Sequence, residues 1–139
     1  MNWMVYAFLS AGAAGATAIL AKIGVRDVPS NLATAIRTVV VLLFSWGIVT
    51  TRGELAGLRA IKGRTLLFLI LSGLATGVSW LAYYRALQLA PASKVAPIDK
   101  LSLPMTVVLA ALVLAEPVSL RLGVGVALMT VGALLTIGA

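Results

Sequence analysis

The stretch "SKVAPIDKLSLPMTVVLAALVL", residues 93–114, has the length of a membrane span and an Asp–Lys pair inside it. Asp99 and Lys100 stand side by side between Pro97 and Pro104, at the head of a long apolar run. A spanning helix needs about 20 mostly apolar residues, and a charge at its centre costs roughly 2.5–3.5 kcal/mol on insertion scales. Such a charge needs a partner or a water-filled cavity, so the stretch predicts a polar site inside a membrane span.

The rest of the chain has the composition of an integral membrane protein. Of its 139 residues, 61% are hydrophobic and 11% are charged, and the mean hydropathy is +1.08. A soluble domain of this length could not bury so much apolar surface. We therefore predict an all-α, multi-pass protein of the cell membrane, of the bacterial inner-membrane type. Its single domain, residues 1–139, should hold five spanning helices at about residues 3–21, 32–50, 66–88, 93–114 and 119–137.

The residue types that the chain lacks exclude several classes of function. Cys and His are absent and only four residues are acidic, so a thiolate, the commonest general base and a set of metal ligands are all missing. We predict that the protein is not an enzyme and uses no metal or cofactor. The net charge of +7 does not predict nucleic-acid binding. The basic residues stand mostly at the ends of apolar blocks, where they contact the headgroups of membrane lipids.

The longest polar connection, "TRGELAGLRAIKGR", lies between the second and third blocks at residues 51–64. Its Leu55, Leu58 and Ile61 recur every third residue, a spacing that fits a short helix lying in the membrane interface. An ordinary cytoplasmic loop is the alternative, and it is the one we expect.

Small residues are concentrated in the blocks, among them Gly73 and Gly77 of the third and Gly123, Gly125 and Gly132 of the last. Membrane helices approach each other closely through such residues, because lipid offers no hydrophobic drive to association. We expect most of them to serve tight packing within one subunit, with a contact between subunits as the alternative.

The Lys and Arg residues are balanced between the two sides of the membrane. If residues 51–64 are cytoplasmic, the inside carries five basic residues and so does the outside. The inner set is Arg52, Arg59, Lys62, Arg64 and Arg121, and the outer set is Lys22, Arg26, Arg85, Lys94 and Lys100. Because an excess of Lys and Arg sets orientation, either another feature fixes it or the chain inserts both ways round. Dual insertion would let one repeat build an inverted-repeat transporter as an antiparallel homodimer.

Several short motifs, taken in order, resemble a known family. They are Tyr84, Ala86 and Leu87, then Pro97, then Glu116, Gly125 and Gly132. Together with "AIRTVVVLL" around Arg37, this order is similar to an EamA-type repeat of the drug/metabolite transporter superfamily. The resemblance covers essentially the whole chain. It implies one inverted-repeat half of that fold, and export or exchange of small metabolites or drugs by alternating access.

Two features depart from that family. Its members usually carry two repeats in one chain, whereas this chain has one. In addition, "IDK" at residues 98–100 stands where many members have apolar residues. The first departure means that a second copy of the chain, or another membrane protein, must complete the transporter.

Asp99 and Lys100 are the first candidates for a substrate or ion site. Neighbouring residues project about 100° apart on a helix, so we expect each to find its partner on another helix. Pro104 has no N–H and should leave the Lys100 carbonyl without a helical bond, as Pro97 should for Ser93. Charges beside free carbonyls in a broken helix are typical of transporter sites. Alternatively, the helix starts at Pro97, with Asp99 stabilising its first turn and Lys100 reaching the headgroups.

Arg37, inside the second block, is the next candidate. Its charge is permanent, so it must pair or face water. Asp99 is the partner we expect, in an ion pair that exchanges for a carboxylate or phosphate of the substrate. An arginine that reaches from the helix end to the headgroups is the alternative.

Aromatic residues near the end of the third block complete the candidate site. Trp80 and Tyr83 are predicted to grip a substrate or cation. Tyr84 shares a helical face with Trp80, yet Tyr84 and Arg85 fit the interfacial aromatic belt better. Glu116, beside Pro117, is by resemblance a structural turn residue and not the coupling carboxylate.

The sequence as a whole predicts a secondary transporter of a small metabolite or drug-like solute. It is expected to work as a homodimer, with Arg37, Trp80, Tyr83, Asp99 and Lys100 at the binding site and with Pro97 and Pro104 breaking a helix. A non-transporting half-repeat subunit that needs a different membrane partner is the alternative.

Overall fold

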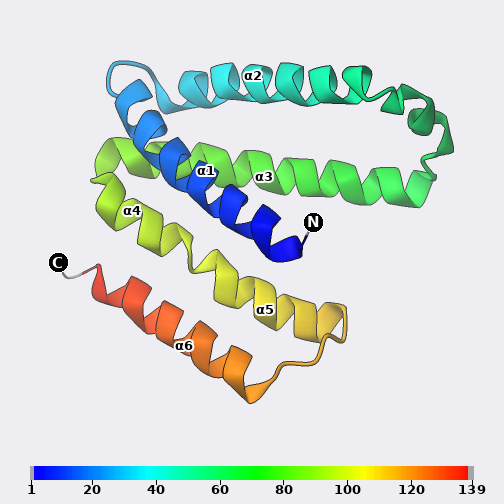
Figure 1. Ribbon diagram of the computed structural model, residues 1–139. Coiled ribbons are helices and arrows are strands. Elements are labelled where there is room, and N and C mark those ends of the chain that lie inside the picture. Colours follow the sequence, from blue (N-terminus) through cyan, green and yellow to red (C-terminus); the bar gives the residue numbers. More distant parts are fainter. Residues whose placement is uncertain (1, 138–139) are drawn as a thin grey trace. The chain divides into compact units, whose positions relative to one another are not determined.

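A computed structural model of the chain describes residues 2–137, which are helical and contain no strand. The helices, shown in Figure 1, are α1 (Trp3–Gly24), α2 (Ser30–Thr51), the 3₁₀ helix η1 (Glu54–Ala60), α3 (Gly63–Leu89), α4 (Ala92–Asp99), α5 (Ser102–Val113) and α6 (Leu120–Leu135). The predicted fold class, an all-α membrane protein, is confirmed.

Within residues 2–137, four stretches are long and apolar enough to cross a membrane: α1, α2, α3 and Ala92–Val113, which takes in both α4 and α5. The fifth predicted block is present as α6, a shorter apolar helix of 16 residues. At 1.5 Å per residue α6 extends about 24 Å, less than the hydrocarbon core of about 30 Å. The chain is therefore a multi-pass membrane protein whose last helix is short for a span.

The chain divides into two compact units. The first, which we call the hairpin unit, is Leu20–Leu89, where α2 and α3 pack against each other and η1 contacts the end of α2. The second, the broken-helix unit, consists of Met1–Ile19 and Ala90–Ala139, and here α6 contacts both α4 and α5.

Each unit has a thin core. In the hairpin unit Val25, Tyr84 and Leu87 are buried, together with the polar Ser30 and Thr34. Most of the large apolar side chains on the helices are exposed, as is expected where lipid, and not water, covers the surface. Little of the apolar surface is thus used within either unit.

Several threonine hydroxyls inside the spans are satisfied by their own helices. Thr34 Oγ1 donates to the Ser30 carbonyl at 2.9 Å, and Thr38 Oγ1 donates to the Thr34 carbonyl at 2.8 Å. Thr106 Oγ1 of α5 does the same with the Ser102 carbonyl at 2.8 Å. Bonds to the carbonyl one turn back let a threonine lie in an apolar environment without an unpaired donor.

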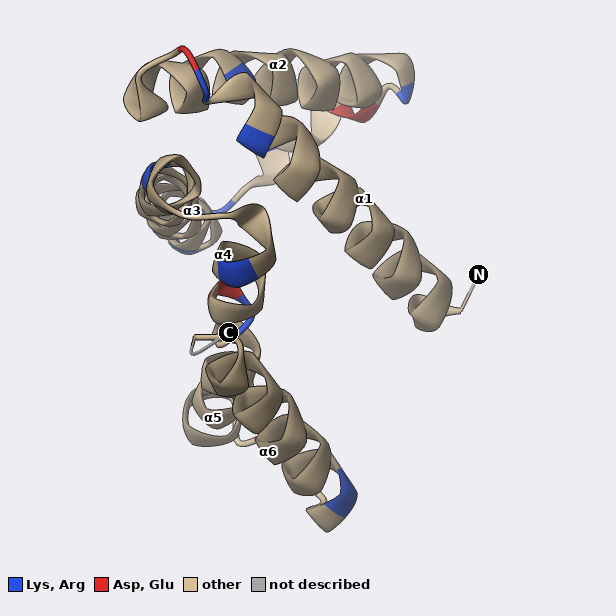
Figure 2. Cartoon of the chain, turned by 90° about the vertical axis from the view of Figure 1, so that its left-hand side faces the viewer, with Lys and Arg blue, Asp and Glu red and all other residues tan. Residues whose placement is uncertain are grey.

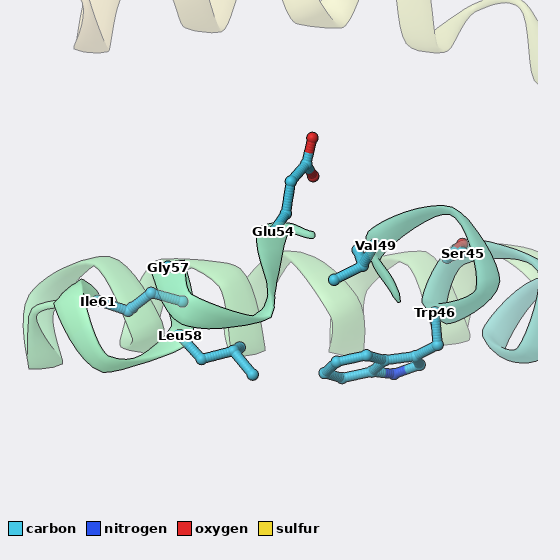
Figure 3. A pocket seen from close by; sticks show the side chains of 7 residues that line it. All are labelled: Ser45, Trp46, Val49, Glu54, Gly57, Leu58 and Ile61. Atoms are coloured by element: carbon cyan, nitrogen blue, oxygen red, sulfur yellow. The ribbon is translucent and has the colours of Figure 1, made fainter. Parts of the chain in front are cut away.

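The segment between α2 and α3 is helical, so the loop that we expected there is wrong. Residues 54–60 form η1, and a cavity of about 230 Å³ lies between it and the end of α2. Figure 3 shows the Leu58 side chain directed toward the Trp46 ring while Glu54 points away from both. Leu58 and Ile61 line this cavity together with Trp46, although all three side chains remain exposed.

The glycines of α3 and α6 are not in close contact with another element of their own unit, and their expected role in packing within one subunit stays a prediction. A Cβ atom built on Gly73 or Gly77 of α3 would meet no atom within 4 Å, and the same holds for Gly123, Gly125 and Gly132 of α6. The packing partner that these residues suit is therefore not an element of the same unit.

Candidate functional site

Arg37 lies in α2 against two aromatic rings of α3. The centroid of the Trp80 ring is 4.0 Å from the Arg37 guanidinium carbon, and that of the Tyr84 ring is 5.6 Å away. Both distances are within the range of a cation–π interaction, which places positive charge on the negative face of a ring. The half-buried guanidinium makes no ion pair within the hairpin unit. Its charge there is stabilised by π faces alone.

The residues before Arg37 extend a polar face along α2. Ser30, Thr34 and Arg37 follow at spacings of four and three residues, which puts them on one side of the helix. Ser30 and Thr34 are buried, and α2 packs against α3. The first half of α2 thus turns its polar side toward the neighbouring helix, and Arg37 is the charged member of that side.

The sequence had favoured Tyr83 over Tyr84 as the aromatic partner of Trp80. In the structure Tyr84 lies over Arg37 and is buried, whereas Tyr83 is half-buried. The spacing of four residues between Trp80 and Tyr84 was the signal for this arrangement. The aromatic belt had been preferred for Tyr84 because the residue is close to the end of its helix.

The fourth span is interrupted at Lys100 and Leu101. α4 ends at Asp99 and α5 begins at Ser102, with a turn between them. Pro97 lies inside α4 and Pro104 lies in the first turn of α5. α4 starts at Ala92, so the alternative in which the helix begins at Pro97 is not found.

The carbonyl of Lys100 is not free, which corrects our expectation. The Leu103 N–H donates to it at 2.9 Å, one residue short of the helical bond that Pro104 cannot make. The Leu101 N–H bonds the Ile98 carbonyl at 3.0 Å in the same tighter pattern. The backbone therefore turns through the interruption by 3₁₀-type bonds, which tighten the chain and satisfy its polar groups.

Asp99 and Lys100 pair with each other, although we expected each to find a partner elsewhere. Lys100 Nζ lies 3.5 Å from Asp99 Oδ2, with the side chains 52% and 35% exposed. The projection argument assumes a continuous helix, whereas α4 ends at Asp99 and Lys100 belongs to the turn. A long and partly exposed ion pair of this kind contributes little to stability.

The pairing of Arg37 with Asp99 stays a prediction, because the two residues belong to different units.

The other acidic residues stand outside the spans. Asp27 is in the connection after α1, Glu54 begins η1, and Glu116 follows α5. Glu116 is exposed, and its N–H donates to the Ala110 carbonyl at 3.3 Å in the turn that Ala115 makes with a φ of 55°. Figure 2 shows how few charged positions lie along the helices, and α4 carries both signs. Among residues 2–137 no cluster of acidic residues could hold a metal ion.

Comparison with known proteins agrees with this description. The sequence profile of the EamA-like transporter family matches residues 1–138. A Sinorhizobium sp. protein described as "Uncharacterized transporter in cobO 3'region" is 50% identical over 134 residues, which cover 96% of this chain and 95% of that protein. No solved structure matches the chain significantly.

Proposed function

The chain belongs to the EamA-like transporter family, and on this premise we propose that it is a secondary transporter of a small organic solute with a carboxylate or phosphate group. It works by alternating access as an antiparallel homodimer of single repeats. Arg37, Trp80, Tyr83, Asp99 and Lys100 form the substrate and ion site, with Tyr84 as a further wall of it.

The observation that carries this proposal is the environment of the Arg37 guanidinium. A guanidinium is charged at every physiological pH, and within its unit this one is held by two ring faces and no carboxylate. Ring faces leave the N–H groups at the edge of the guanidinium available, and these suit a planar anion such as a carboxylate or a phosphate. A solute with that group would supply the anion that Arg37 lacks in the hairpin unit.

The interruption of the fourth span supports a hinge motion of α4 and α5 during transport. Asp99 and Lys100 form a long, partly exposed ion pair at the point where the helix ends. Because such a pair is weak, either residue can exchange its partner for a substrate group or a coupling ion. The turn at residues 100–101 is the hinge about which α4 and α5 rock, and Asp99 is the coupling residue.

Three features support the homodimer. The family match extends over residues 1–138, the Lys and Arg residues are balanced between the two sides, and the glycine positions of α3 and α6 are open within their units. A second copy inserted the other way round would cover these helix faces and give the inverted-repeat architecture of transporters. Each copy would contribute one Arg37 and one Asp99 to a central cavity.

The alternative is a half-repeat subunit that does not transport by itself and needs a different membrane protein. The open glycine positions are compatible with this alternative too, because any partner helix that packs closely could cover them. The balanced charge favours the homodimer instead, since a dedicated heteromeric half is expected to carry a charge bias opposite to that of its partner.

Transport is tested with purified protein in liposomes. A panel of small carboxylates, phosphates and neutral solutes of matched size is screened for counterflow, with Arg37→Gln and the same-helix control Arg52→Gln alongside. We expect the wild type to exchange an anionic solute. The Arg37→Gln variant should lose this exchange activity, and the Arg52→Gln variant should keep it. Exchange of neutral solutes alone, or of none by a folded protein, would contradict the proposal.

Orientation decides between the two assemblies. The chain has no cysteine, so Gly57→Cys and Ala92→Cys can be labelled from one side of native membranes against a clean background. If each site labels in part of the population from either side, the antiparallel homodimer is supported. If Gly57→Cys labels from one side only, the homodimer is excluded as proposed and a different partner is required.

A further inference from the structure

A basic pocket lies at the end of the hairpin unit, where the connection after α1 meets the end of α3. It measures about 350 Å³ and is lined by Lys22, Val25, Arg26, Arg85, Leu87, Gln88 and Leu89. Three of these residues are cationic and none is acidic. Val25 and Leu87, which are almost fully buried, form its rigid floor.

Hydrogen bonds hold the walls of this pocket in place. Lys22 Nζ donates to the Leu87 carbonyl. Gln88 Nε2 donates to the carbonyls of Val25 and Val28 at 3.2 and 2.8 Å, and Arg85 donates to Gln88 Oε1 at 3.1 Å. The carbonyls of Val25, Val28 and Leu87 are thus already satisfied by Lys22 and Gln88. The remaining positive charge of the pocket is not needed to cap these helices.

Arg26 is the cation of the pocket that takes part in none of these hydrogen bonds. Across residues 2–137 its guanidinium makes no hydrogen bond and no ion pair. The hydrogen-bond partner of Arg85, the Gln88 amide, is neutral and supplies no negative charge to pair with the guanidinium. The pocket therefore offers two guanidinium groups that make no ion pair with a carboxylate, Asp27 beside Arg26 included, a pattern that suits a phosphate.

Because α1 and α3 both end there, at Gly24 and Leu89, we expect the pocket at the depth of the lipid headgroups. An apolar side chain lines the pocket together with the cations, because Leu89 is 71% exposed there. A free anion would gain nothing from this side chain. A lipid would place its phosphate among the cations and an acyl chain along the apolar residues.

We propose that this pocket binds the phosphate group of an anionic phospholipid. The proposal does not depend on transport, because it uses none of the residues assigned to the substrate site. In an antiparallel homodimer, one such pocket would face each leaflet.

Lipid binding is measured by native mass spectrometry of the purified protein in a neutral detergent, with phosphatidylglycerol titrated against zwitterionic phosphatidylcholine. A basic residue near a membrane surface contributes about a fivefold gain in affinity for anionic lipid. Arg26→Gln should therefore weaken phosphatidylglycerol binding about fivefold, and Arg26→Gln/Arg85→Gln roughly 30-fold. Arg26→Gln breaks no bond of its side chain, so it is expected to fold normally.

The matched control is Arg59→Gln/Arg64→Gln, which removes the same charge from the far end of the hairpin unit and should leave the affinity unchanged. Equal weakening by the control would show diffuse attraction and overturn the site. Unchanged affinity in the pocket variants would also overturn it. Inorganic phosphate is titrated in a third arm, and if it displaces phosphatidylglycerol at equal concentration, the ligand is a free anion and the lipid assignment is wrong.

Discussion

The two units of this protein handle a charge within an apolar helix in different ways. In the hairpin unit α2 continues past Arg37, whose guanidinium lies on Trp80 and Tyr84. In the broken-helix unit the helix stops at Asp99, and Lys100 sits in the turn that follows. A continuous helix thus carries the cation, whereas the only acidic residue of the spans stands at an interruption.

Physical chemistry accounts for the difference. A guanidinium is weakly hydrated and flat, so ring faces replace part of its water. A carboxylate is repelled by the same ring faces, because the face of an aromatic ring carries the negative part of its quadrupole. A carboxylate needs N–H groups, a cation or water instead. At the end of α4 the helix dipole also disfavours a negative charge. Asp99 is therefore less well stabilised than Arg37, which makes it the better candidate for a residue that changes partner during transport.

The largest effect is expected from a substitution at Asp99, the less well stabilised of the two charges. Asp99→Ala should reduce transport in liposomes to background while the protein still purifies as a folded species, because the exposed pair with Lys100 contributes little to stability. The control is Asp27→Ala, an exposed carboxylate in the connection after α1. Wild-type exchange by Asp99→Ala would remove this residue from the mechanism.

The second largest effect is expected at Arg37, the better stabilised of the two charges. Arg37→Gln should lower exchange of the anionic substrate roughly 10- to 100-fold, since a hydrogen bond to a charged group contributes about 1.5–3 kcal/mol. Arg37→Lys keeps the charge and loses the flat geometry, so it should fall between Arg37→Gln and the wild type. Equal activity of all three proteins would mean that Arg37 is a structural residue.

A smaller effect tests the ring contact itself. Trp80→Leu should lower the free energy of unfolding by about 1–2 kcal/mol, the range of a partly desolvated cation–π interaction. Trp80→Phe should lose less, because a ring remains. Chemical unfolding in detergent measures both, with the exposed Trp3→Leu as the control. If Trp80→Leu and Trp3→Leu are alike, the ring does not stabilise Arg37.

The smallest effect concerns the interruption of the fourth span. Pro104→Ala returns an N–H that the Lys100 carbonyl can accept in addition to, or in place of, the Leu103 N–H, so stability should rise by at most about 0.5–1 kcal/mol. Hydrogen exchange of the amides in residues 101–105 should slow, and transport should slow with it if the turn is a hinge. Pro91→Ala, ahead of α4, is the control. Unchanged exchange rates would show that Pro104 does not cause the interruption.

Much of the fold could be predicted from composition and periodicity. The spans at α1, α2 and α3 follow directly from the length of their apolar blocks, and Asp99 and Lys100 were recognisable by charge alone. A loop was preferred over the short helix at residues 54–60 because three apolar residues at a spacing of three are weak evidence for a helix, and their side chains stay exposed in the structure. The Asp99–Lys100 pair was missed because the helix was assumed to continue through Lys100.

The sequence by itself determined that the chain crosses a membrane, which charges lie within its spans and that prolines flank one of them. These are consequences of transfer free energies and backbone chemistry, which act residue by residue. Only the tertiary structure decided that Tyr84 joins Trp80 over Arg37, and that Lys22, Arg26 and Arg85 line one pocket. Such contacts depend on how each helix is rotated about its axis against its neighbour. Apolar composition that is nearly uniform around a membrane helix does not encode that rotation.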